Sequence, residues 1–87
     1  MDVIYPGPLD EYDWFLIDQK GWLEVTLRHD GQSRSVTFYD ATRLAETVEG
    51  DVRGRGYFVE SALVVLPKLT REAIESVATR IMAHLAA

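Results

Sequence analysis

The run Arg53-Gly54-Arg55-Gly56-Tyr57-Phe58 contains residue types that bind nucleic acid. In single-strand binders, arginine contacts phosphate and aromatic rings stack on bases. Here the motif occurs once, with Glu49, Asp51 and Glu60 close by, and the 87-residue chain carries a net charge of −5. Because nucleic-acid binding usually shows as a basic surface, we interpret this run as a flexible link between a helix and a strand. A nucleic-acid partner is not expected.

A second set of polar residues lies beside two predicted helix starts. If a strand near 62–66 runs parallel to one near 36–40, both following helices begin at the same edge of the sheet. Backbone amides at helix starts, aided by cations, can hold a phosphate or carboxylate. This alternative predicts a small-anion or nucleotide site at residues 40–43 and 70–73, made of Thr42, Arg43, Lys68, Thr70 and Arg71. The competing interpretation is that Asp40 and Thr70 only cap their helices, since no glycine-rich phosphate loop precedes them.

Patterns for catalysis or metal binding are missing from the sequence. His29 and His84 stand without a neighbouring nucleophile, and no serine lies in a nucleophile-elbow context. The chain contains no cysteine, which excludes disulfides, thiolate metal sites and thiol nucleophiles. No spacing matches a zinc or calcium motif. The sequence therefore predicts no catalytic residue, no metal and no cofactor, and it favours a non-enzymatic protein.

The leading hypothesis concerns an aromatic face of the predicted sheet. If 12–18 is a strand, the face away from the helices gathers the candidate partner-binding residues Trp14, Leu16, Trp22, Glu24 and Tyr39. Contiguous exposed apolar patches tend to be interfaces, and tryptophan and tyrosine are enriched at binding hot spots. Acidic neighbours such as Asp13 and Asp18 would select a basic partner. This hypothesis predicts a homodimer or another partner protein. The alternatives are that the segment 3–9 folds over these rings, or that they lie in the core.

A hairpin anchors the predicted sheet. Asp30-Gly31 separates two β-rich runs and suits a two-residue type I′ turn, because glycine accepts a positive φ. The turn predicts a register with Trp22 opposite Tyr39, Leu23 opposite Phe38, and Val25 opposite Val36. A preceding strand, joined through a loop ending in Gly21, is expected to place Phe15 opposite Val25 and Ile17 opposite Leu23.

Two helices are expected after the hairpin. Asp40 is a good N-cap for the first, and Gly50 is a natural stop. Pro67 ends the last strand, and Thr70 caps a second helix in which Leu69 and Ile74 form a hydrophobic staple.

Together these elements predict an α+β fold, a two-layer sandwich in the order β-β-β-α-β-α. It consists of an antiparallel three-stranded meander and a βαβ crossover strand, with two helices on one sheet face. We expect a single small domain over 1–87, with 1–9 as a loosely ordered N-terminal arm. The first fifteen residues lack the pattern of a secretory signal, and no apolar stretch approaches the ~20 residues needed to cross a bilayer. A cytoplasmic protein without a membrane partner is therefore expected.

Overall fold

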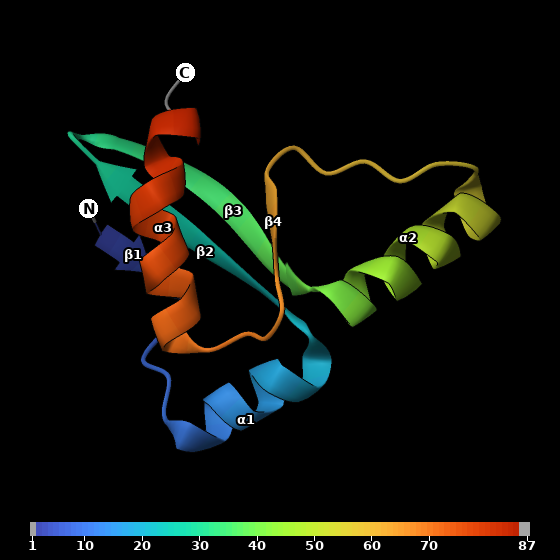
Figure 1. Cartoon of the computed structure of the whole chain (residues 1–87), viewed down its shortest axis with the longest axis horizontal. Coiled ribbons are helices and arrows are strands. Elements are labelled where there is room, and N and C mark those ends of the chain that lie inside the picture. The colour runs from blue at the N-terminus through green and yellow to red at the C-terminus, as the bar shows by residue number, and fades with distance from the viewer. Residues whose placement is uncertain (1, 86–87) are drawn as a thin grey trace.

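The computed structural model describes residues 2–85, and side chains for residues 2–81. Over this range the chain forms a mixed four-stranded sheet with three helices, which confirms the α+β class (Figure 1). The strands are β1 (Asp2–Ile4), β2 (Trp22–His29), β3 (Gln32–Asp40) and β4 (Leu63–Leu66). The helices are α1 (Glu11–Lys20), α2 (Ala41–Arg55) and α3 (Arg71–Leu85). When α1 is set aside, the order of the other elements is the predicted β-β-β-α-β-α.

The β2–β3 hairpin has the predicted turn and register. Asp30 and Gly31 adopt φ of 50° and 77°, as a type I′ turn requires. Trp22 lies opposite Tyr39, Leu23 opposite Phe38, and Val25 opposite Val36. Because side chains alternate along a strand, this register determines which side chains enter the core and which lie on the other sheet face.

Strand β4 completes the predicted crossover. It pairs with β3 in parallel, with Phe38 beside Val64 and Tyr39 beside Val65. The strands lie in the order β1-β2-β3-β4, so the last strand is next to the third rather than at the far edge.

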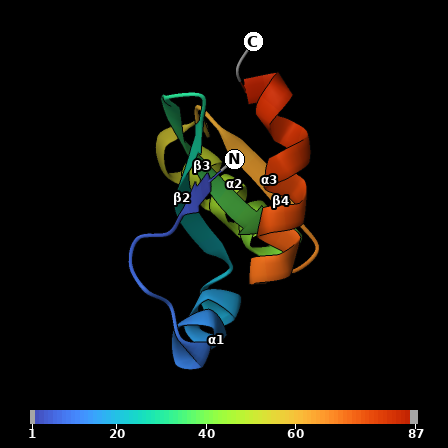
Figure 2. The same ribbon diagram turned by 90° about the vertical axis from the view of Figure 1, so that its left-hand side faces the viewer.

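Helix α3 covers the core face of the sheet (Figure 2). Thr70 caps this helix as predicted, since its hydroxyl accepts a hydrogen bond of 3.1 Å from the backbone N–H of Ala73. Leu69 and Ile74, the expected staple pair, are both buried. The core consists of Ile17, Leu23, Val25, Leu27, Val36, Phe38, Leu66, Leu69, Ile74 and Ala78.

The expectation of a strand over 12–18 is wrong, because this segment is helix α1. Asp10 and Asp13 form a capping box, in which each side chain accepts a hydrogen bond from the other's backbone N–H. Gly21 ends the helix at a φ of 83°, the left-handed conformation typical of a helix C-cap. The predicted pairs of Phe15 with Val25 and of Ile17 with Leu23 therefore do not form.

The N-terminal segment takes the place of that strand. β1 pairs antiparallel with β2, with Val3 opposite Leu27. Val3, Tyr5 and Leu9 pack against the core, so the described part of the expected arm is attached to the domain.

Helix α2 starts at the predicted cap but continues beyond the predicted stop. The Asp40 side chain accepts a hydrogen bond of 2.7 Å from the backbone N–H of Arg43. The helix passes through Gly50 and ends at Gly56, which has a φ of 91°. Two ion pairs between residues four apart span this second half and stabilise it. No residue of α2 is buried, and the helix extends away from the sheet (Figure 1), so α3 rather than a pair of helices covers the core face.

Candidate interaction surface

The arginine-glycine run lies in the second half of α2 and in the turn after it. Arg53 pairs with Glu49, and Arg55 with Asp51 at 3.0 Å, both one helical turn earlier. The Arg55 guanidinium also lies 4.6 Å from the centre of the Tyr57 ring. Each arginine charge therefore faces a carboxylate of the same helix, and the run presents no basic groove.

The predicted anion site is divided between two places. Asp40 pairs with Leu66 in the sheet, so α2 and α3 do begin at the same end of it. Arg43 lies 3.6 Å from Glu46, and both Thr42 and Arg43 are exposed at the start of α2. The remaining three residues, Lys68, Thr70 and Arg71, line a cleft that includes neither Thr42 nor Arg43.

Trp22, Glu24 and Tyr39 lie together on the sheet face away from α3, because they alternate with the core residues of β2 and β3. The two rings of this group are largely covered. The Lys20 ammonium lies 3.8 Å from the centre of the Trp22 ring. Tyr39 is buried and donates a hydrogen bond of 3.0 Å to Glu60. Burial and the Glu60 carboxylate raise the pKa of Tyr39.

Trp14 and Leu16 do not join that group, because they belong to α1 and not to the sheet. On α1, Trp14 and Ile17 are one turn apart and face inward; Ile17 is buried, and Trp14 packs against the core. Leu16 lies on the outer side of the helix, next to two aromatic residues that were not among the predicted site residues.

Helix α1 exposes three large apolar side chains, which we call the α1 face. The exposed fractions are 66% for Tyr12, 57% for Phe15 and 44% for Leu16. The Tyr12 and Phe15 rings stack on each other with their centres 6.4 Å apart. An aromatic pair in solvent beside a further leucine is the type of patch that marks an interaction site.

The opposite side of α1 is held by the N-terminal segment and α3. Trp14 meets Tyr5 edge to face at 5.5 Å between ring centres. The Arg71 guanidinium lies 4.8 Å from the Tyr5 ring and 5.2 Å from the Trp14 ring, and it donates a hydrogen bond to the Leu9 carbonyl. Arg71, one of the predicted anion ligands, is therefore used to hold α1 in place.

This packing affects two polar groups, the hydroxyl of Tyr5 and the indole N–H of Trp14. Burial raises the pKa of the Tyr5 hydroxyl to about 12, helped by the Glu75 carboxylate that accepts its hydrogen bond at 3.2 Å and opposed by Arg71. The indole N–H of Trp14 is buried and has no hydrogen-bond acceptor within the described part of the chain. An unpaired buried donor costs stability, typically about 1–3 kcal/mol.

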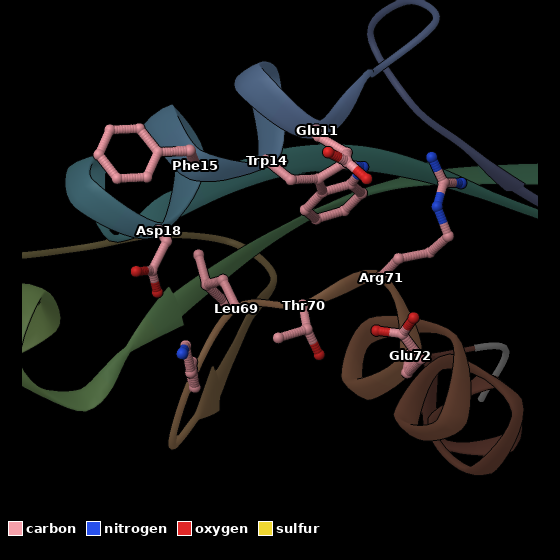
Figure 3. Close-up of a pocket in the computed structure, with 9 residues that line it drawn as sticks. Glu11, Trp14, Phe15, Asp18, Leu69, Thr70, Arg71 and Glu72 are labelled. Atoms are coloured by element: carbon pink, nitrogen blue, oxygen red, sulfur yellow. The ribbon is translucent and has the colours of Figure 1, made fainter.

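A cleft of about 390 Å³ separates α1 from the start of α3. Its apolar lining residues are Trp14 and Phe15 from α1 and Leu69 from the segment before α3. In Figure 3, Leu69 lies across from α1, whereas the Phe15 ring points away to the side. The polar residues that complete the lining are Glu11, Asp18, Lys68, Thr70, Arg71 and Glu72.

The surroundings of the cleft are acidic. The carboxylates of Glu11, Asp18 and Glu72 form no ion pair or hydrogen bond with other described residues. Asp10 and Asp13 add two further carboxylates at the start of α1, whereas Lys20 is the one basic residue of that helix. The α1 face is therefore an apolar surface with an acidic rim, the chemistry that the sequence predicted for the sheet.

Tyr12 and Phe15 were missed because the segment was interpreted as a strand. The signals that could have found them are Asp10 and Asp13 at capping-box spacing and Gly21 at the helix end. In a helix, Trp14 and Ile17 share one side and Tyr12 and Phe15 share the opposite one.

Comparisons with protein-family models, with curated proteins and with solved structures found no match to the chain. Within the described residues, no group of three or more histidine, cysteine, aspartate or glutamate side chains is placed to hold a metal ion. The described helices are all too short or too polar to cross a membrane. The case for a function therefore depends on the geometry of the surface alone.

Proposed function

We propose that the protein is a small non-enzymatic interaction module that docks a partner protein on the α1 face. The observation that carries this proposal is the exposure of Tyr12, Phe15 and Leu16 together on one helix, beside a cleft. Aromatic residues that border a pocket are the usual anchors of protein interfaces, because a partner removes a large apolar area from water there.

The acidic rim of the α1 face determines the charge of the partner that it suits. Carboxylates surround the α1 face, so a segment that combines apolar and basic side chains complements it in charge and would be steered towards it. A second copy of the chain, the other occupant expected from the sequence, would bring the same carboxylates together across the contact. We therefore favour a basic partner over a homodimer. The expected cytoplasmic location is part of the same proposal.

The rim also disfavours the small-anion alternative. A phosphate in the cleft would meet Lys68 and the α3 start, but it would also lie near Glu11, Asp18 and Glu72. Thr70 already uses its hydroxyl to cap α3, and Arg71 is packed on two rings. The remaining donors are too few to outweigh three nearby carboxylates.

The test is a titration of isotope-labelled protein with a synthetic amphipathic peptide of leucine, alanine and lysine, followed by amide resonances. We expect saturable shifts concentrated in α1 and at 68–72. Phe15→Ser should weaken binding about tenfold or more, since burying an aromatic side chain is worth about 1.5–3 kcal/mol.

The matched control is Tyr57→Ser, because Tyr57 is a comparably exposed aromatic residue far along the chain, at 54%. This variant should bind like the wild type. Shifts spread evenly over the protein, or equal losses in both variants, would contradict the proposal. Light scattering at the same concentrations tests the homodimer, and a dimer abolished by Phe15→Ser would assign the α1 face to self-association instead.

A further inference from the structure

We infer that the cleft between α1 and α3 is the anchor site for an arginine side chain of the partner. This inference rests on the proposed function and specifies its chemistry. The cleft opens directly beside the α1 face, since Phe15 belongs to both. A segment lying on the α1 face can therefore insert one side chain into the cleft.

The shape of the cleft suits one long side chain. Its volume of about 390 Å³ is near the lower end of the ~300–1,000 Å³ found for small-molecule sites. Trp14 and Phe15 offer apolar surface to the methylene stem and ring surface to a planar cation, whereas Leu69 is buried. The cleft is open rather than enclosed, so the backbone of a partner can remain outside while a single side chain enters.

The charges of the cleft lining favour a cationic side chain. Glu11 and Asp18 lie on the α1 side of the cleft and Glu72 on the α3 side, and all three lack a partner among the described residues. Lys68 and Arg71 are the two cations of the lining, and the Arg71 guanidinium is held over the Tyr5 and Trp14 rings. The lining therefore has more carboxylates than available cations, and an added positive charge compensates the excess.

Arginine fits this lining better than lysine. Its guanidinium presents five N–H donors in a flat fork, which can bond to carboxylates on two walls while its plane lies against a ring. Arg71, itself part of the lining, already makes the ring contact, since its guanidinium lies over the Tyr5 and Trp14 rings. Lysine offers a compact, strongly hydrated charge that cannot make the planar contact.

The experiment compares two peptides of the amphipathic design above, one with arginine and one with citrulline at the anchor position. Citrulline has nearly the same shape but no charge. Binding is measured by calorimetry, together with amide shifts at 11–18 and 68–72. We expect the arginine peptide to bind about tenfold more tightly or better. Asp18→Asn should weaken the arginine peptide more than the citrulline peptide, and so reduce that advantage by about fivefold or more.

Glu24→Gln is the matched control, because Glu24 is an exposed carboxylate on the sheet and lies outside the cleft lining. It removes the same charge and should preserve the arginine advantage. If Glu24→Gln and Asp18→Asn weaken binding of the arginine peptide equally, the effect is general charge attraction. The proposal of an arginine anchor site in the cleft would then be wrong.

Two further outcomes separate this inference from the proposed function. Equal binding of the arginine and citrulline peptides, with shifts still in α1, overturns the anchor site and leaves the interaction surface standing. Absence of binding by either peptide overturns both. Saturable shifts at 68–72 with inorganic phosphate alone would overturn the anchor site in favour of an anion site.

Discussion

The pair Trp22 and Tyr39 and the pair Tyr12 and Phe15 have almost the same composition but opposite surroundings. Trp22 lies beneath the Lys20 ammonium, and Tyr39 is buried and bonded to Glu60. Tyr12 and Phe15 contact each other and are otherwise exposed to solvent. The first pair is part of the packed structure, whereas the second is exposed to solvent.

Because the two pairs differ so much in exposure, aromatic residues with acidic neighbours are not sufficient to define an interaction site. On the sheet, Trp22 is covered by Lys20, two residues before it, whereas Tyr39 is bonded to Glu60 from the segment before β4. On α1, the N-terminal segment and Arg71 occupy the inner side of the helix and leave the outer side uncovered.

The most direct test of the difference in burial between the two pairs is to remove one ring from each pair and compare the losses of stability. Tyr39→Ala should lower the free energy of unfolding by about 3 kcal/mol or more, because it deletes a buried ring and leaves a cavity. Tyr12→Ala should change it by less than about 0.5 kcal/mol, as is usual for an exposed position. Urea denaturation of both variants is the measurement. Similar losses would mean that Tyr12 is also part of the packed structure.

The junction between the two regions is Gly21, and it can be tested next. A Cβ at Gly21 would lie 2.6 Å from the Arg43 Cβ and 2.9 Å from an Asp40 side-chain oxygen, at a φ of 83°. Gly21→Ala should therefore cost about 2 kcal/mol or more, from backbone strain and from the displacement of α2. Thermal unfolding measures the loss.

Gly56→Ala is the control that introduces backbone strain without a steric clash. Gly56 has a φ of 91°, but an added Cβ would meet nothing within 4 Å. We expect a loss of about 1 kcal/mol. An equal loss at both glycines would show that α1 and α2 do not meet closely at Gly21.

The two covered tyrosines should make the protein sensitive to alkali. The pKa of Tyr5 is raised to about 12, and that of Tyr39 is also raised, above the value of 10.0 expected in an unfolded chain. Their contribution to stability is therefore complete below about pH 10 and is lost as the pH rises towards 12. Urea midpoints measured over this range should fall, and Tyr5→Phe should flatten the decline. A decline of unchanged slope in that variant would contradict the assignment to Tyr5.

The smallest effect is expected at the indole of Trp14. Trp14→Phe removes an N–H that has no acceptor among the described residues, which offsets the packing lost with the smaller ring. The free energy of unfolding should change by less than about 1 kcal/mol. Trp14→Ala should cost about 3 kcal/mol, since the ring packs against the core. A loss above about 2 kcal/mol for Trp14→Phe would mean that the N–H is hydrogen bonded.

Local chemistry was enough to predict the hairpin and the starts of α2 and α3. The Asp30-Gly31 turn is the main determinant of the β2–β3 register, and Asp40 and Thr70 cap α2 and α3 through hydrogen bonds within three residues. Such features depend on neighbours in the sequence, so pattern and structure agree. The stop expected at Gly50 failed because glycine within a helix costs only about 1 kcal/mol, which other interactions can compensate.

The α+β class, the hairpin register and the acidic, aromatic character of the surface follow from the amino-acid sequence alone. Only the tertiary structure decided where that surface lies. The capping box at Asp10 and the C-cap at Gly21 are local signals that the run around Trp14 is a helix. The pairing of Val3 with Leu27 and the packing of Tyr5 and Arg71 on Trp14 then fix how that helix lies on the domain. Contacts between residues far apart in the chain select one side of α1 for the core, and the other side is left to the solvent.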